Sequence, residues 1–275
     1  FAGDEIRWKP GVRWLDQVLI FPSVRVDHYS LYGTAWSPKI GFNGLKRDGK
    51  TYYAIRASAG KNFRVPTFNE RFWRGDGAIG NESIKPERSF SIDAGVTYGA
   101  ETPIGSMQLD LNVFRIRTRD QIVWLVSNPV TPINQAKTVS QGYECMATYV
   151  FKNFWRSEIN YTKNRAVDQS EPDRDYRARY QPLYSFKMSH IFTQGSWTVT
   201  ETTRYVSERF ANLQNTLVLK PYWVTDAGFG YTFRINNIRT NLRVDVKNLF
   251  DAYFEPVSLF PTVAREWYFS IAITH

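Results

Sequence analysis

The stretch Leu242-Arg243-Val244-Asp245-Val246-Lys247-Asn248 alternates apolar and polar side chains residue by residue. Successive side chains of a β-strand point to opposite faces, so this period of two predicts a strand with one apolar and one polar face. The segment 265–274 has the same period, with its apolar phase at Trp267, Phe269, Ile271 and Ile273. No segment carries a 3.6-residue apolar stripe over three turns, so the pattern favours an all-β fold.

A long strand is also expected at 106–125, where the apolar phase slips by one residue. The apolar residues are first Leu109, Leu111 and Val113, and then Phe114 and Ile116. One extra residue in a β-bulge shifts the phase in this way, so we expect a bulge next to Val113.

About 13 strands are expected from such patterns over the whole chain. They lie at 1–8, 17–29, 34–42, 51–60, 88–98, 106–125, 139–151, 154–164, 183–193, 196–208, 221–233, 239–249 and 265–274. Short connections at 42–50, 99–105, 152–153, 194–195 and 235–238 tend to alternate with long polar ones at 61–87, 126–138, 165–182, 209–220 and 250–264. This alternation predicts an antiparallel up-and-down sheet with its long loops at one end, which is typical of a transmembrane β-barrel.

The composition of the 275 residues narrows the class of protein further. No apolar run approaches the ~18–20 residues that a membrane helix needs, which excludes a helical membrane protein. The single Cys145 excludes an intramolecular disulfide framework and the usual cysteine-based zinc sites. The net charge of +9 favours an anionic partner and does not choose among nucleic acid, lipid phosphates and acidic ligands.

Aromatic residues make up 16% of the chain. In a transmembrane barrel they form girdles at the two membrane interfaces. The rings expected near strand ends are Trp36, Trp73, Trp124, Trp155, Tyr161, Tyr205, Tyr222, Trp223 and Trp267. For any one of these rings, ordinary packing on a strand is an equal alternative.

Five segments resemble, in order, motifs from the C-terminal half of TonB-dependent outer-membrane receptors. Arg25-Val26-Asp27-His28-Tyr29 with Ser37-Pro38-Lys39-Ile40-Gly41 resembles the pattern RxDxY…SPRLG. The segment 61–70 resembles FRAPxxxE, and the segment 80–87 resembles GNPxLKPE. Arg204-Tyr205-Val206 resembles RYVG, and the segment 246–253 resembles VxNLFDxxY. The chain departs from the family in lacking a plug domain and a TonB box, in its strand number and in ending on His275.

The resemblance implies TonB-dependent active transport of a scarce nutrient across the bacterial outer membrane, with a ferric siderophore, another metal chelate or cobalamin as the nutrient. Residues 1–275 would be the C-terminal portion of a probable 22-stranded barrel, a single domain that is incomplete on its own. An open sheet in lipid leaves unpaired backbone groups at two edges, each costing several kcal/mol. By analogy with the family, the loop 61–87 is extracellular and the C-terminus periplasmic.

The resemblance also implies the partners. They are the N-terminal barrel half and plug (on the same polypeptide or on a second chain), the TonB complex acting through the plug, outer-membrane lipid and lipopolysaccharide, and a small-molecule ligand. Nucleic acid is not expected, because the basic residues are spread over loops and strands instead of lying on one recognition element.

No catalytic pattern, cofactor or metal site is expected. The histidines His28, His190 and His275 have no ligand spacing and suit a structural or surface role. Polar strand positions hold Asp27, Asp93, Asp110 and Asp245, which we expect to face a wet lumen beside Arg25, Arg115 and Arg243. This arrangement is favoured over a glycosidase pair of carboxylates.

The main alternative is a smaller closed outer-membrane barrel that acts as a porin or phospholipase. His28-Tyr29-Ser30 has the His-x-Ser spacing of the outer-membrane phospholipase, and residues i and i+2 of a strand share a face. The flanking residues match the receptor pattern instead and lack the Asn-Gly that follows in that enzyme. A soluble β-rich carbohydrate binder is a third possibility, and it would need no detergent.

The long loops hold most of the candidate binding residues. Arginine forks suit carboxylate and phosphate, and aromatic rings add stacking surfaces. The candidates are Arg64, Arg71, Phe72, Trp73 and Arg74 in one loop, Arg177, Arg179 and Tyr180 in a second loop that also holds Arg174, and Arg209 in a third. Two functions compete for them: recognition of an anionic ligand such as a ferric chelate, or binding of lipopolysaccharide phosphates. For any single residue, a solvated loop surface is the simpler interpretation.

Overall fold

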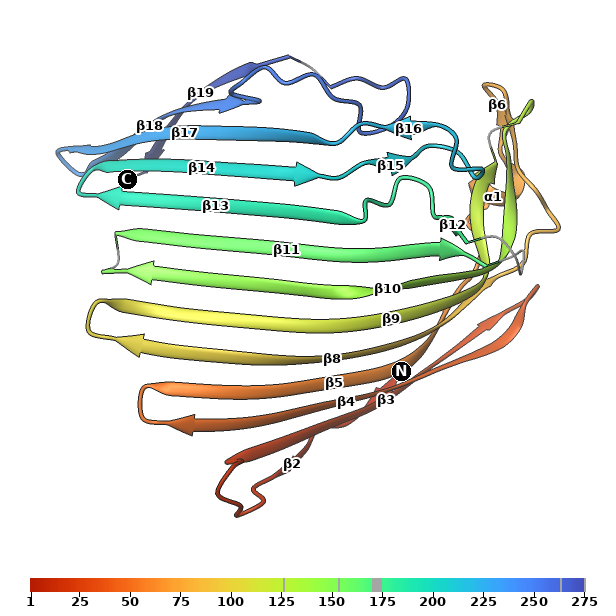
Figure 1. The fold of residues 1–275 in the computed structure, drawn as a ribbon, viewed down its shortest axis with the longest axis horizontal. Coiled ribbons are helices and arrows are strands. Elements are labelled where there is room, and N and C mark those ends of the chain that lie inside the picture. The colour runs from red at the N-terminus through yellow and green to blue at the C-terminus, as the bar shows by residue number, and fades with distance from the viewer. Residues whose placement is uncertain (126, 153, 170–174, 263, 275) are drawn as a thin grey trace.

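The computed structural model describes residues 1–125, 127–152, 154–169, 175–262 and 264–274. Most of their strands form one antiparallel 15-stranded sheet, in which all the long strands follow one another in sequence order (Figure 1). The sheet holds β1 (Ala2–Gly3), β2 (Ile6–Trp8), β3 (Gln17–Tyr29), β4 (Gly33–Asp48), β5 (Thr51–Arg64), β8 (Glu87–Thr102), β9 (Gly105–Leu125), β10 (Thr131–Phe151), β11 (Trp155–Asp168), β12 (Tyr176–Arg177), β13 (Tyr184–Gln194), β14 (Trp197–Val206), β17 (Tyr222–Ile235), β18 (Ile238–Lys247) and β19 (Glu266–Thr274). The expected all-β, up-and-down order is confirmed.

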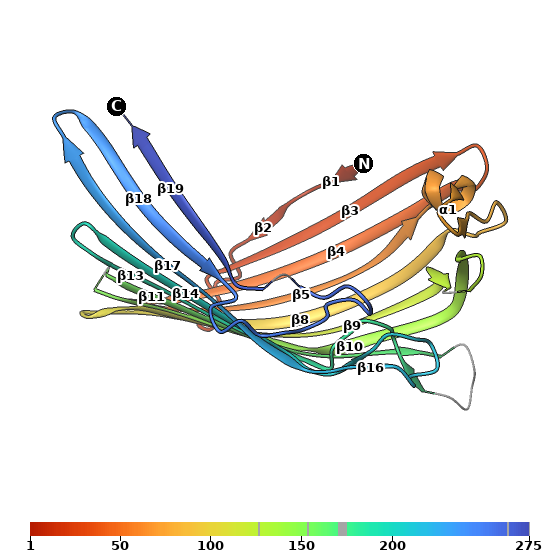
Figure 2. The same ribbon diagram turned by 90° about the horizontal axis from the view of Figure 1, so that it is seen from above.

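The sheet is curved into a trough (Figure 2). Its first and last strands, β1 and β19, lie on opposite rims, so the sheet is a barrel wall that is not closed within this chain. The short elements α1 (Phe68–Phe72), β6 (Arg74–Gly75), β7 (Ala78–Ile79), β12, β15 (Arg209–Phe210) and β16 (Val218–Leu219) all lie at one end of the strands (Figure 1). The expected separation of long loops from short turns is therefore confirmed.

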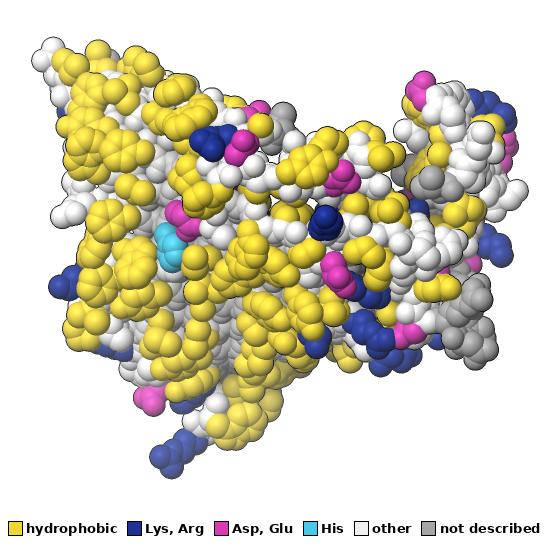
Figure 3. Space-filling view, turned by 45° about the horizontal axis from the view of Figure 1, so that its top comes forward, with side chains coloured by type: hydrophobic (Ala, Val, Ile, Leu, Met, Phe, Trp, Pro, Cys, Tyr) yellow, Lys and Arg dark blue, Asp and Glu magenta, His cyan; other side chains and the backbone are white. Residues whose placement is uncertain are grey.

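The two faces of the sheet differ because apolar and polar residues alternate along each strand. The convex face, seen obliquely in Figure 3, is covered mainly by hydrophobic side chains. On neighbouring strands Ile55, Val96 and Leu111 lie opposite one another in register, and each is about half exposed. Apolar side chains that form a continuous exposed wall suit contact with lipid. The concave face carries the polar phase.

Several strands extend further than the sequence pattern indicated. β4 continues to Asp48 and β10 begins at Thr131, so most of 42–50 and part of 126–138 are strand. Lys46 and Arg47 pair with the first residues of β5, although their polarity suggested a turn. The physical reason is that strands continue past the apolar band, where both faces are hydrated and alternation disappears. The expected first strand, 1–8, is two short strands that both pair with β3.

The expected bulge next to Val113 is wrong. The ladders from β9 to β8 and to β10 run without interruption from Gly105 to Arg119. The phase changes because the residues on the convex face change from apolar at Val113 to basic at Arg115, Arg117 and Arg119. The pairs Arg119 with Lys137 and Gln121 with Gln135 keep the same register of β9 on β10.

The aromatic positions match the expected girdles in part. Trp155 and Trp197 lie where strands leave the short turns, and the rings of Tyr205 and Trp223, 4.6 Å apart, lie toward the loop end. The exceptions are Trp73, which follows α1 in a loop, and Trp124, which lies near the end of β9 in the hairpin that extends beyond the apolar wall. Tyr161 in the middle of β11 and Tyr222, whose ring stacks on Phe254 at 4.1 Å, are also exceptions.

The described part of the chain contains no helix with the length and hydrophobicity required to cross a bilayer.

Candidate functional site

The loop between β5 and β8 starts with a short helix that a capping box fixes. The Thr67 side chain accepts a hydrogen bond from the Glu70 backbone N–H, and the Glu70 carboxylate accepts one from the Thr67 N–H. Pro66 precedes this cap and donates no backbone hydrogen bond, which suits the exit from β5. The motif that suggested a family pattern therefore has a local physical role: it ends a strand and begins a helix.

Arg64 closes this arrangement from the end of β5. Its guanidinium donates to Glu70 Oε1 at 3.1 Å and to Glu87 Oε1 at 2.7 Å. Burial alone would raise the pKa of Glu70, but the Thr67 N–H and the Arg64 guanidinium outweigh it and hold that pKa below its usual value. The two carboxylates thus hold Arg64 between β8 and α1.

The other four candidates of this loop lie together but differ in their contacts and in how far their side chains are exposed. The Arg71 guanidinium lies over the rings of Phe72, at 4.5 Å, and Tyr32, at 5.9 Å. Trp73 follows α1, and its ring N–H donates to the Gly75 carbonyl. Arg74 is the most accessible of the charged ones, with 75% of its side chain exposed and a loose ion pair to Glu82 at 3.9 Å.

The same loop is pinned to the far end of the β9–β10 hairpin. The Asn81 side chain donates to the Pro132 carbonyl, and the Lys85 backbone N–H donates to Asn134 Oδ1 at 2.8 Å. Ile84 is 2% exposed. These contacts show what the segment 80–87 does: it fastens the loop to a neighbouring hairpin before β8 begins.

Arg177, Arg179 and Tyr180 lie in the loop that follows β11, on the other side of that hairpin. The Arg177 backbone N–H donates to Asn215 Oδ1 at 2.7 Å, and its guanidinium lies 5.1 Å from the Phe210 ring centre. Arg179 donates to the Trp124 carbonyl at 2.7 Å. Tyr180 has a φ of 58°, and its N–H donates to the Phe210 carbonyl. Arg174, from the same expected cluster, lies outside the described residues.

Arg209 is the most buried of the candidates, at 3% exposure. Its guanidinium donates to the carbonyls of Glu255 and Pro256 and lies 5.2 Å from the Tyr222 ring centre. It therefore joins β15 to the loop before β19 and does not present its fork to solvent.

The structure brings the candidate residues to one end of the sheet, around one hairpin. Asn81 fastens the first loop to Pro132, Arg179 fastens the second to Trp124, and those two hairpin residues pair with each other. A cavity of about 540 Å³ lies beside Arg179 and Tyr180, with Ile116, Gln135 and Leu213 among its lining residues. Arg64 and Arg209 lie on opposite sides of this assembly, each held by its own partners.

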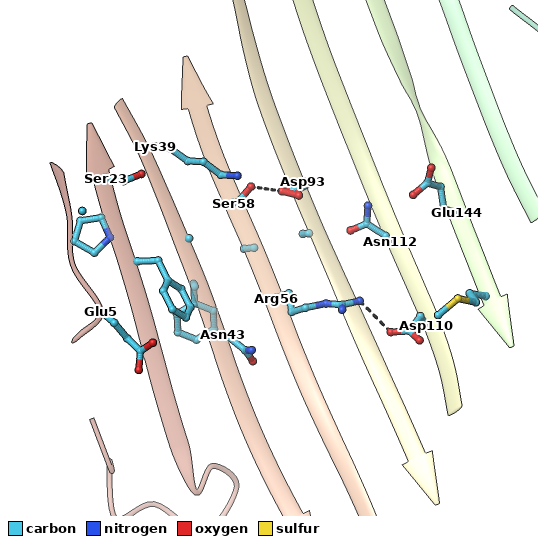
Figure 4. A pocket seen from close by; sticks show the side chains of 18 of the residues that line it. Glu5, Ser23, Lys39, Asn43, Arg56, Ser58, Asp93, Asp110, Asn112 and Glu144 are labelled. Atoms are coloured by element: carbon cyan, nitrogen blue, oxygen red, sulfur yellow. Dashed lines mark hydrogen bonds and ion pairs between the residues drawn. The ribbon is translucent and has the colours of Figure 1, made fainter. Parts of the chain in front are cut away.

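The concave face carries a larger cavity of about 1150 Å³, lined by both apolar and charged side chains (Figure 4). Arg56 points toward Asp110, with 3.0 Å between Nη2 and Oδ1, and the Ser58 hydroxyl donates to Asp93 at 2.5 Å. Lys39 and Glu144 also line the cavity, and neither makes an ion pair within the described residues. Charged and amide side chains of the concave face are therefore accessible for contacts inside the trough.

The expected lumenal pairs are confirmed in part. Arg25 pairs with Asp27 at 2.7 Å and Arg243 with Asp245 at 2.6 Å. The expected position of Arg115 is wrong, because it lies on the convex face and Arg56 takes the place beside Asp110. Arg56, Lys39 and Glu144 were not predicted as wall residues of this cavity. The alternation of polar and apolar residues could have identified them, because each occupies a polar position of its strand.

The geometry gives little support to a phospholipase-like His28–Ser30 pair or to a histidine metal site. His28 Nδ1 lies 3.0 Å from Thr34 Oγ1, and Ser30 lies beyond the end of β3. His190 lies 6.0 Å from the Trp155 ring, and His275 is outside the described residues. Among the residues described, no group of three His, Cys, Asp or Glu side chains could hold a metal ion.

Comparison with known proteins agrees with this geometry. The family model described as TonB dependent receptor-like, beta-barrel, matches residues 1–249. The vitamin B12 transporter BtuB of Photobacterium profundum is 24% identical over 257 residues, covering 90% of this chain and 39% of that protein. BtuB of Vibrio vulnificus is 29% identical over 130 residues, which is 46% of this chain and 20% of that protein.

Solved structures show the same fold. The ferric enterobactin receptor PfeA of Pseudomonas aeruginosa (mutant G324V) superposes with a TM-score of 0.70 at 17% identity, covering 94% of this chain and 43% of the receptor. The copper transporter OprC superposes with a TM-score of 0.69 at 15% identity, covering 98% of this chain and 46% of OprC. The chain spans less than half the length of these relatives. It belongs to the TonB-dependent receptor family, whose β-barrels are bacterial outer-membrane proteins.

Proposed function

We propose that this chain supplies part of the barrel wall and the ligand-binding loops of a TonB-dependent transporter for a scarce nutrient. The single observation that carries this proposal is the open, two-faced sheet with its arginine- and aromatic-bearing loops gathered at one end (Figure 1). In this proposal residues 1–275 are a C-terminal barrel portion that another part of the polypeptide, or a second chain, closes. The loop end faces the outside of the cell.

The polar concave wall supports a plug in the trough. Lys39 and Glu144 line a cavity of about 1150 Å³ and have no ion-pair partners among the described residues. Backbone and side-chain groups of a plug would complement them. TonB would act on that plug, and this chain would do no covalent chemistry.

The ligand would be a ferric siderophore, another metal chelate or cobalamin. Names of the relatives point to this range, since they include a vitamin B12 transporter and a ferric enterobactin receptor. Among the loop candidates, Phe72, Trp73 and Arg74 have the exposure needed to contact a ligand. Arg64 and Arg209 would act indirectly, by holding the loops in place.

Ligand binding by the full-length receptor tests this proposal. The purified receptor in detergent would be titrated with a ferric catecholate, a ferric hydroxamate and cobalamin, with tryptophan fluorescence as the signal. We expect saturable binding of one of them, weakened at least about tenfold by Trp73→Ala with Arg74→Ala, which corresponds to ~1.4 kcal/mol. The control is Arg234→Gln at a short turn. No saturable binding, or nutrient uptake that persists without TonB, would contradict the proposal.

A further inference from the structure

The convex face carries a row of basic side chains at the loop end of the strands. Arg115, Arg117 and Arg119 follow one another on this face of β9, with successive residues about 6.6 Å apart. In register, Arg119 lies directly between Arg88 of β8 and Lys137 of β10. Like charges directly opposite one another destabilise a sheet, so this row requires a compensating anion.

The described residues supply no such anion. Arg88, Arg117, Arg119 and Lys137 are exposed, and none of them forms an ion pair within the part of the chain that the structure describes. The carboxylate of Glu87, the neighbour of Arg88, is already bound by Arg64 and by the Ile122 backbone N–H. Arg88, Arg117, Arg119 and Lys137 therefore face outward without acidic partners among the residues that the structure describes.

A groove opens beside this row because two strands separate. The β4–β5 ladder stops at Lys39 and Gly60, whereas the β5–β8 ladder continues to Arg64 and Glu87. The gap between the diverging ends has a volume of about 560 Å³. Its lining includes Trp36, Lys61, Arg88, Phe90, Arg117 and Arg119.

The groove lies at the boundary between two kinds of surface. Toward the short turns, the same face carries Ile40 and Ile92, each about half exposed and part of the apolar wall. Toward the loops it carries the cations, and basic side chains gather at that end in Figure 3. Exposed rings of Trp36 and Phe90 lie at the transition, as amphipathic and aromatic side chains do at a membrane interface.

We propose that this groove binds the phosphorylated headgroup of a lipid in the outer leaflet, with the acyl chains lying along the apolar wall below. Arginine forks bind phosphate oxygens in pairs, and a phosphate monoester carries about −1.5 to −2 charges. Two such groups balance the charge of the four basic residues that line the groove itself, which are Lys61, Arg88, Arg117 and Arg119. The lipid is therefore a bisphosphorylated one, and the site is separate from the nutrient site in the loops.

Native mass spectrometry of the full-length receptor tests the proposal. The probes are bisphosphoryl lipid A, monophosphoryl lipid A, phosphatidylglycerol and inorganic phosphate. Replacing Arg117 and Arg119 by Gln should reduce the bisphosphoryl lipid A adduct at least about tenfold, which corresponds to ~1.4 kcal/mol, because the phosphates lose charge-assisted hydrogen bonds. The matched control is Arg234→Gln with Arg239→Gln, which removes the same charge at the short-turn end.

The adducts of the groove variant and of the control distinguish specific lipid binding from general charge attraction. Selective loss of the bisphosphoryl adduct in the groove variant supports the proposal. Equal loss in the control, equal binding of phosphatidylglycerol, or displacement by inorganic phosphate would overturn it in favour of general charge attraction or a simple anion site. If the first variant does not assemble, Lys61→Gln with Arg88→Gln on the other wall of the groove must give the same selective loss.

Discussion

Replacing Arg209 by Ala should open the loop before β19 and leave the sheet intact. The guanidinium of this residue, 3% exposed, holds the carbonyls of Glu255 and Pro256 and lies 5.2 Å from the Tyr222 ring centre. Loss of these contacts removes the only hydrogen bonds that the Arg209 side chain makes within the described residues. The loop then lacks its tie to β15.

The magnitude follows from these contacts. Hydrogen bonds from a charged group contribute about 1.5–3 kcal/mol, and the lower end applies because Glu255 and Pro256 are not fully buried and water can replace part of the loss. The contact with the ring adds about 1 kcal/mol. A total of about 2–3 kcal/mol corresponds to a roughly 30- to 150-fold rise in loop opening.

Hydrogen–deuterium exchange of the full-length receptor measures this opening directly. Peptides covering 250–262 should exchange faster in Arg209→Ala by that factor, and peptides from β9 and β10 should be unchanged. Arg209→Met retains the packing volume without the donors and should give a smaller rise. Arg74→Ala, at an exposed position of another loop, is the control. If the loop exchanges equally in all four proteins, Arg209 does not hold it.

Three further predictions test the fold and the loops. Acidification should open the helix α1, because the pKa of Glu70 in the folded protein lies below its unfolded value near 4.5. The stability that the Glu70 carboxylate provides is complete above that value and is lost as the pH falls through the folded pKa. Hydrogen exchange at α1 should therefore rise below about pH 4.5, and Glu70→Gln should remove this pH dependence. Gly142→Ala should block assembly of the barrel, since its Cβ would lie 1.8 Å from a backbone oxygen of β11, whereas Gly41→Ala, whose Cβ would lie 3.6 Å from a ring, should assemble; heat-modifiable migration on gels would separate the two. Leu111→Arg on the convex face should destabilise the barrel by about 2–4 kcal/mol in lipid, and Asn112→Arg on the concave face should not, so equal melting temperatures for the two variants would show that the faces are assigned wrongly.

The candidate binding residues show where sequence reasoning succeeds and where it stops. Loop position and residue type indicated Arg64, Arg74 and Arg209 alike. Their surroundings separate them: two carboxylates hold Arg64, backbone carbonyls hold Arg209, and Arg74 is mainly solvated. These partners lie up to 47 residues away along the chain, so no local pattern encodes them.

The error at Arg115 has a different origin. Alternation identifies which residues share a face, but a change from apolar to basic side chains on one face looks the same as a slip of register. The uninterrupted pairing of β9 with β8 resolves the ambiguity, because it fixes Arg115 on the face of Val113 and Leu111.

The all-β class, the order of the strands and the end at which the loops gather could all be predicted from the amino-acid sequence. These depend on a period of two and on connection lengths, which are local properties of the chain. The folded sheet was needed to show which arginines are free, where β4 separates from β5, and how the loops meet on the β9–β10 hairpin. Those features depend on contacts between residues distant in sequence, and their energies come from burial and pairing that exist only once the sheet has formed.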